Sequence, residues 1–124
     1  MGKYPKQDCV FCDYQGVILG KFQHAFVIEP LDPVTKGHKL VIPFVHVQDA
    51  TDIPWLTGKV FEYASEVSLW TWGAANLITS IGPDATQSVM HLHVHVVPRK
   101  HNDGLKLPWT DQKKVVHPIE RSTS

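Results

Sequence analysis

The sequence lacks the marks of several large protein classes. No apolar run approaches the ~18 residues of a membrane-spanning helix, and the first residues lack the apolar core of a secretory signal peptide. Neither charge is in excess, because Lys and Arg together number 12 and so do Asp and Glu. A general nucleic-acid or membrane-surface binder needs a basic excess. These absences predict a soluble cytoplasmic protein that binds neither nucleic acid nor a membrane.

Cysteine is scarce as well, with Cys9 and Cys12 as the whole complement. A structural disulfide is not expected in a cytosolic chain, and no strand precedes the pair as a thioredoxin-like redox motif would require. Two thiolates at this spacing chelate zinc well but supply half of a tetrahedral site. The other two ligands would come from elsewhere in a chain that contains eight histidines.

The length of 124 residues predicts one domain over residues 1–124, with its core over about 9–100 and a C-terminal extension over 101–124. Short apolar runs rich in β-branched residues, separated by turn residues, predict an antiparallel meander and two further strands. The expected strands cover residues 17–19, 24–29, 38–42, 75–81 and 91–97.

One long helix is expected between the third and fourth strands. Thr51 or Asp52 is expected to cap its N-terminus, Pro54 is tolerated in the first turn, and the helix should end near Gly73. Its tryptophans are expected in the core or in a subunit interface. Apolar residues recur at helical spacing along it and form one stripe: Ile53, Leu56, Val60, Ala64, Val67 and Trp70.

Three histidines, His91, His93 and His95, alternate with apolar residues. In a β-strand such side chains share one face of the sheet, whereas a helix would scatter them over about 200°. The pattern therefore predicts three imidazoles side by side on a strand that Pro98 ends. Such a row is typical of a metal site, or of an imidazole that attacks phosphorus while its neighbours fix its tautomer. The spacing alone leaves both chemistries open.

Residues 91–97 resemble the motif of the histidine triad (HIT) family of nucleotide hydrolases and transferases, His-x-His-x-His-x-x with apolar x. Residues 37–46, Gly-His-Lys-Leu-Val-Ile-Pro-Phe-Val-His, are similar to its Gly-His-x-Leu-Val-Ile-Pro-x-x-His strand. Residues 9–12 match its Cys-x-x-Cys, and residues 87–88, Gln-Ser, stand at its polar pair. This resemblance, over about residues 9–100, implies an α+β fold: a five-stranded antiparallel sheet, one long helix and a short N-terminal helix, usually in a homodimer.

The resemblance also implies a mechanism. His93 would attack the α-phosphate of a nucleotide conjugate, and water would then release the nucleoside monophosphate from a covalent nucleotidyl-histidine. A backbone carbonyl is expected to hold the other ring nitrogen of His93 and so fix its tautomer. His95, Gln87 and Ser88 are expected to donate to phosphoryl oxygens or the leaving group, with Ser88 supplying the leaving-group proton. The expected substrate is a purine nucleoside phosphoramidate or a dinucleoside polyphosphate.

In metal-containing members of the family, the two cysteines are completed by two histidines, which correspond here to His46 and His91. The resemblance therefore implies a structural Zn²⁺ held by Cys9, Cys12, His46 and His91, and no organic cofactor. Without the metal, His46 and His91 are expected to hydrogen-bond each other behind the nucleophile.

Some positions depart from the family pattern. Ser80 stands where the family often has asparagine, and Thr86 replaces a glycine. Either Glu29 or Asp32 is expected to grip the ribose hydroxyls, so the expected substrate-binding set is Glu29, Asp32, Ser80 and Thr86. Two other functions stay open: a non-catalytic nucleotide-binding or scaffold module that uses the same pocket, and a metalloenzyme with zinc on the three strand histidines.

Overall fold

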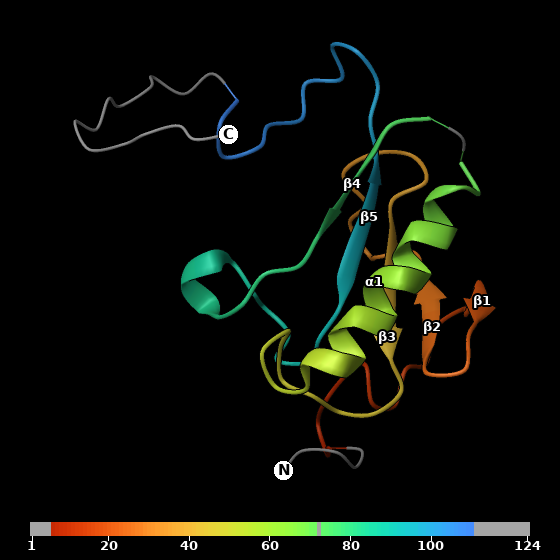
Figure 1. Cartoon of the computed structure of the whole chain (residues 1–124), viewed down its shortest axis with the longest axis vertical. Helices are drawn as coiled ribbons and strands as arrows, with labels where there is room; N and C mark the ends of the chain where they lie inside the picture. The colour runs from red at the N-terminus through yellow and green to blue at the C-terminus, as the bar shows by residue number, and fades with distance from the viewer. Residues whose placement is uncertain (1–5, 72, 111–124) are drawn as a thin grey trace.

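A computed structural model describes residues 6–71 and 73–110, and it contains one antiparallel sheet of five strands with one main helix (Figure 1). The strand order is β1-β2-β3-β5-β4. The α+β fold with a five-stranded antiparallel sheet is therefore confirmed. The strands are β1 (Gly20–Lys21), β2 (Ala25–Ile28), β3 (Lys39–Pro43), β4 (Ala75–Ile78) and β5 (Val94–Pro98).

The histidine-bearing strand β5 lies inside the sheet, between β3 and β4. Its register pairs His95 with Leu40 of β3 on one side and with Ile78 of β4 on the other. Because both neighbours hold the backbone of His95, the position of its ring is set by the sheet and not by a loop. A rigid element of this kind holds a functional side chain more accurately than a loop does.

The helix α1 (Pro54–Ser68) lies across one face of the sheet (Figure 1). The predicted apolar stripe is confirmed from Leu56 to Val67, because these residues are buried against Val41, Val94 and Val96 of the sheet. Trp70 lies beyond the helix and is 47% exposed. The opposite face carries a second, smaller apolar cluster that includes Phe11, Phe26, Ile28, Leu40 and Ile42.

The predicted helix boundaries were wrong at both ends. Thr51 and Asp52 do not cap α1, because Thr51 donates to the Asp49 carboxylate and Asp52 accepts from the Gln48 amide. The N-cap is Ile53, which makes no side-chain capping bond. The helix ends at Ser68, well before Gly73. At the N-terminal end, Thr51 and Asp52 form hydrogen bonds in the turn before the helix instead of capping it. The apolar periodicity of the sequence does not reveal this competition between turn and cap.

The expected short N-terminal helix is also absent from the described residues. The cysteine segment instead forms turns, with the Cys12 amide donating to the Cys9 carbonyl at 3.1 Å. The extension expected over residues 101–124 is described as far as residue 110, and the rest lies outside the described residues. None of the helices in residues 6–71 and 73–110 is long and apolar enough to cross a bilayer.

The histidine strand begins three residues later than predicted. His91 and His93 precede β5, because the His91 amide donates to the Val89 carbonyl and the Leu92 amide donates to the Val47 carbonyl. This segment is therefore paired with a loop and not with the sheet. As a result, the three imidazoles do not form one row: His91 turns away from the other two.

Candidate active site and metal site

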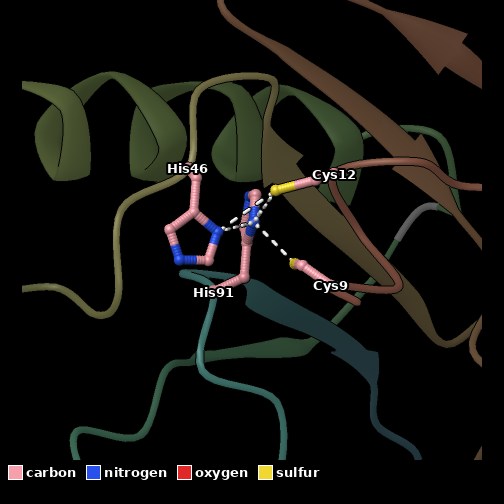
Figure 2. Close-up of side chains that lie close together, drawn as sticks. All are labelled: Cys9, Cys12, His46 and His91. Atoms are coloured by element: carbon pink, nitrogen blue, oxygen red, sulfur yellow. Dashed lines mark hydrogen bonds between the residues drawn. The ribbon is translucent and has the colours of Figure 1, made fainter. Parts of the chain in front are cut away.

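Two cysteines and two histidines converge beside the N-terminal turn (Figure 2). Cys9 and Cys12 come from that turn, His46 from the loop after β3, and His91 from the segment before β5. Their Sγ and Nδ1 atoms all lie within 4.8 Å of one another. The Sγ of Cys9 is 3.4 Å from Nδ1 of His91, and the Sγ of Cys12 is 3.2 Å from Nδ1 of His46.

The donor set fits a tetrahedral metal ion. Nε2 of His91 donates to the Pro43 carbonyl at 2.9 Å, so its Nδ1 carries a lone pair. That single lone pair faces both sulfurs and Nδ1 of His46, which is 3.1 Å away, and it can accept from only one donor. An ion bound at about 2.3 Å to sulfur and about 2.0 Å to nitrogen would hold such ligand pairs about 3.3–3.8 Å apart.

The electrostatics of this cluster agree with metal binding. Burial lowers the pKa of His91 to about 4, so its ring is neutral at pH 7, the form that binds metal. Burial raises the pKa of the Cys12 thiol, and a bound cation would reverse that shift. A zinc ion on the three alternating histidines does not fit, because His91 faces the cysteines and not His93 and His95.

The ring of His93 is oriented by the main chain. Its Nδ1 lies 2.8 Å from the carbonyl oxygen of His91, so Nδ1–H donates and Nε2 carries the free lone pair. This is the carbonyl contact expected from the sequence. Phe11 packs edge-on against the ring at 5.2 Å between centroids, and burial lowers the pKa of His93. His93 is therefore neutral at pH 7, with a fixed tautomer and a free lone pair on Nε2.

A chain of hydrogen bonds sets the tautomer of His95. The Val34 amide donates to Nδ1 of His38 at 3.1 Å, so the proton of His38 is on Nε2. That Nε2–H donates to Nδ1 of His95 at 2.9 Å, which leaves Nε2–H of His95 as a donor. Burial, with nearby His93 and His38, lowers the pKa of His95 to about 4. The ring centroids of His93 and His95 are 5.2 Å apart.

A cavity of about 270 Å³ adjoins His95 and His38. Ser80 and Thr86, both expected to contact substrate, line it. Of the two candidate ribose acids, Glu29 interacts electrostatically with His38, which is near the cavity. Asp32 is exposed on the same loop between β2 and β3.

Gln87, expected to donate to a phosphoryl oxygen or the leaving group, forms hydrogen bonds with the main chain. Its side chain is buried, and its Nε2 group donates to the carbonyls of Gln48 and Val89 at 2.8 and 3.0 Å. Its Oε1 accepts from the Gly82 amide at 2.8 Å. Both amide hydrogens are therefore used, and Gln87 positions the turn that carries Thr86 instead of donating to a phosphoryl group. This turn contains η1 (Pro83–Ala85).

Ser88 is exposed and lines another cavity, of about 430 Å³, together with Cys9 and His46. The structure therefore brings Ser80 and Thr86 to the cavity of His95 but does not bring Ser88 there.

The family model described as HIT domain matches residues 13–102. The chain belongs to the HIT family. It is similar to the crystal structure of a HIT family protein from Bacillus anthracis, with a TM-score of 0.71, 31% identity and coverage of 83% of this chain and 82% of the other. A zinc-bound histidine triad family protein from Mycobacterium smegmatis has a TM-score of 0.66 and 31% identity, with 80% of each chain covered.

Among sequence relatives of this HIT protein is adenylylsulfatase HINT3 from Arabidopsis thaliana, which is 27% identical over 93% of this chain and 62% of the relative. An uncharacterized HIT-like protein from Borreliella burgdorferi is 30% identical, with 78% of this chain and 79% of the relative covered.

Two residues of the HIT protein that were not predicted from the sequence hold the histidines in place. His38 fixes the tautomer of His95, and Thr79 donates to the His93 carbonyl at 2.7 Å. His38 lies in the Gly-His-Lys-Leu-Val-Ile-Pro segment that carries the family resemblance, so the motif could have identified it as a site residue. Thr79 belongs to no such motif, and its hydrogen-bond partner is 14 residues away in the sequence.

Proposed function

We propose that this HIT protein hydrolyses or transfers nucleoside monophosphates from nucleotide conjugates through a covalent nucleotidyl-His93. The observation that carries this proposal is the pair of oriented rings: a free Nε2 lone pair on His93 beside an Nε2–H donor on His95. A neutral nucleophile next to a hydrogen-bond donor suits displacement at an anionic phosphorus. The name of the Arabidopsis relative, adenylylsulfatase, supports a purine conjugate of this kind.

In the first step, Nε2 of His93 bonds to the α-phosphorus, and the bond from phosphorus to the leaving nitrogen or oxygen breaks with its electron pair on the leaving atom. A leaving amine takes one proton from solvent. In the second step, water bonds to phosphorus, the bond to His93 breaks, and one water proton returns to solvent. Two displacements replace one difficult attack by water.

The surrounding residues have separate roles in this scheme. Nε2–H of His95 would donate to a phosphoryl oxygen, and the hydroxyls of Ser80 and Thr86 would contact the substrate in the adjoining cavity. Gln87 would act as a positioning residue. Glu29 is preferred to Asp32 for the ribose contact, because the Glu29 carboxylate interacts electrostatically with His38.

We also propose that Cys9, Cys12, His46 and His91 hold Zn²⁺. When bound, the ion supplies a structural cross-link between the N-terminal turn and the segment before β5. Four protein ligands would fill a tetrahedral site, so the ion would act in stability and positioning.

The experiment uses a fluorogenic adenosine phosphoramidate as substrate and intact-protein mass spectrometry on the quenched reaction. The wild-type chain should turn the substrate over and show a nucleotidyl adduct, and His93→Ala should lose both. His101→Ala, which changes an exposed histidine outside the site, is the matched control. Unchanged turnover in His93→Ala, or nucleotide binding with neither adduct nor turnover in the wild type, would overturn the proposal. The second result would favour a binding module.

A cytoplasmic homodimer is the proposed state of the protein. The strand β4 is half-buried and lies at the edge of the sheet, so within the described residues no further strand pairs with its outer side, where a second copy could pair. Light scattering on the full chain tests this, and a monomer at micromolar concentration would contradict it.

A further inference from the structure

The two cysteines lie at the first and fourth positions of a tight turn. The Cys12 amide donates to the Cys9 carbonyl at 3.1 Å. A turn closed by this bond holds its first and fourth Cα atoms within about 7 Å, and a disulfide needs Cα atoms about 4.4–6.8 Å apart. The backbone therefore places the pair close to the geometry of an intramolecular disulfide.

The two sulfurs also face a common partner. Sγ of Cys9 is 3.4 Å and Sγ of Cys12 is 3.6 Å from Nδ1 of His91, and the sulfurs lie within 4.8 Å of each other. Figure 2 shows both of them pointing toward the His91 ring. Because the turn already holds the backbone, rotation about the two Cα–Cβ bonds is the movement that a bond of about 2.0 Å between the sulfurs requires.

The two sulfurs differ in their access to solvent. Cys9 lines the cavity of about 430 Å³ that also contains Ser88 and Met90, whereas Cys12 is not among the residues that line it. The Sγ of Cys12 instead accepts from the main-chain amide of Lys6 at 3.2 Å and lies 3.2 Å from Nδ1 of His46. A small oxidant in the solvent would therefore reach Cys9 first.

A change at the cysteine turn would reach His93. Phe11 lies between the cysteines, and its ring packs edge-on against His91 and His93, with centroids 5.8 and 5.2 Å apart. Metal ions bind the thiolate form of cysteine, so a disulfide is a poor ligand. A bond between the sulfurs therefore removes two of the four donors of the cluster that holds His91, whose carbonyl orients His93.

We propose that Cys9 and Cys12 form an oxidation site, in which a peroxide converts them into a disulfide, displaces the metal and loosens the ring of His93. Cys9 is the residue that reacts with the peroxide, and Cys12 is the resolving residue. Redox-sensing cysteines are accessible to solvent and often lie next to a resolving cysteine. The inference rests on the proposed metal site and assigns two of its ligands a second chemistry.

The reaction has two steps. The Cys9 thiolate attacks one oxygen of hydrogen peroxide, the O–O bond breaks, and hydroxide leaves a Cys9 sulfenic acid. The Cys12 thiolate then attacks the Cys9 sulfur, the S–O bond breaks, and a second hydroxide leaves. The two sulfurs give up two electrons, the peroxide accepts them, and both hydroxides take protons from solvent. A dithiol reductant reverses the reaction and is itself oxidised to a disulfide.

The experiment treats the full chain, loaded with Zn²⁺, with a small excess of hydrogen peroxide. Intact-protein mass spectrometry should show the loss of two hydrogen atoms, and a chromogenic chelator should detect one released Zn²⁺ per chain. Ring ¹⁵N NMR should show that His93 loses its single tautomer, and dithiothreitol with added Zn²⁺ should restore the starting state. Thiols that stay reduced, or a disulfide that leaves the bound metal or the His93 signal unchanged, would overturn the proposal.

Single cysteine variants test the order of the two steps. Cys12→Ser should stop the reaction at the Cys9 sulfenic acid, which dimedone labels, whereas Cys9→Ser should give no such label. Equal labelling of the two variants would refute the assignment of Cys9 as the reacting residue.

Met90→Leu is the matched control, because it removes the other sulfur that lines the same cavity. This variant should form the disulfide as the wild type does. A gain of oxygen without a loss of hydrogen, present in the wild type and absent in Met90→Leu, would assign the oxidation to Met90 and refute the proposal.

The readouts separate this inference from the metal site and from the proposed function. A reduced chain that binds no Zn²⁺ would refute the metal site, and disulfide formation with the His93 signal would then decide the inference. A chain that does not turn over the phosphoramidate would refute the proposed function, whereas the mass, the released metal and the NMR signal do not depend on turnover.

Discussion

The carbonyl oxygen of His91 accepts a hydrogen bond from Nδ1 of His93 at 2.8 Å, while the imidazole of His91 faces Cys9 and Cys12. One residue thus takes part in both sites, with its side chain in the candidate metal cluster and its main chain on the proposed nucleophile. Phe11, carried between the two cysteines, packs against the rings of both histidines. The state of the metal cluster should therefore affect the orientation of His93.

Removal of the metal should both destabilise the protein and loosen His93. We expect a strong chelator to lower the thermal midpoint by about 10 °C, which corresponds to a few kcal/mol for a chain of this size. Ring ¹⁵N NMR should also show that His93 loses its single tautomer. The variant Cys9→Ser/Cys12→Ser is the control and should not respond to chelator. A wild-type protein loaded with zinc that keeps its midpoint and its tautomer in chelator would contradict this prediction.

Ser80 and Ser88 should differ in their effect on turnover. Ser80 lines the cavity of His95 and Ser88 does not, so Ser80→Ala should lower kcat/KM for a nucleotide phosphoramidate at least tenfold, as expected for a hydrogen bond to a charged group. Ser88→Ala should have a smaller effect. A larger loss of kcat/KM in Ser88→Ala than in Ser80→Ala would contradict this prediction and support Ser88 as the leaving-group donor expected from the sequence.

Acid should weaken the fold through His95. The folded-state pKa of His95 is about 4, below the ordinary 6.5, because its ring is buried among His93 and His38, with Glu29 near His38. A depressed pKa means that the unfolded chain binds the proton more readily, so stability is lost as pH falls from about 6.5 to about 4. After allowance for its partial exposure, His95 should contribute about 2 kcal/mol.

Urea denaturation at pH 7, 5.5 and 4.5 measures this dependence, with His95→Gln as the comparison. The free energy of unfolding of the variant should change less over this range than that of the wild type. Parallel pH profiles for the two proteins would contradict the assignment to His95.

Thr86 should be strained. It adopts φ = +72°, in the left-handed region that a β-branched residue rarely enters. Thr86→Gly should raise the free energy of unfolding by about 0.5–1 kcal/mol, because relief of the strain exceeds the added entropy of the unfolded chain. Thr86→Ala keeps the strain and should not stabilise. Equal stability of the two variants in urea denaturation would exclude backbone strain as the cause.

The main features of the fold were predictable because they follow from local patterns. The apolar stripe from Leu56 to Val67 predicted the buried face of α1, and the β-branched runs predicted β2, β3 and β4 close to their observed positions. The strand expected over residues 17–19 was wrong, because β1 lies at Gly20–Lys21, the residues expected to form the turn. The start of β5 was not predictable in this way. His91 has the alternation of a strand residue, but its ring is drawn into a cluster with Cys9 and Cys12, which lie far away in the sequence.

The residues of the site also divide into those that a local sequence pattern marks and those that depend on distant contacts. The family motif singled out His93 and His95, whose ring centroids lie 5.2 Å apart. A departure from that motif singled out Thr86, which lines the cavity and has a positive φ, a conformation that glycine adopts readily. The structural parts of Gln87 and His38 depend on hydrogen bonds to residues 39 and 57 positions away. No local propensity records such partners.

The hydrogen-bond acceptor that orients His93 is the main-chain carbonyl of His91. No amino-acid substitution removes a main-chain carbonyl. A single substitution can remove the proposed nucleophile or a candidate metal ligand, but it can only displace the acceptor. In a saturation library, replacements of His93 should therefore be uniformly inactive. Those at position 91 also remove a candidate metal ligand, so they should form a graded series of reduced activity, ordered by how far the loss of the ligand and the new side chain together shift the main chain.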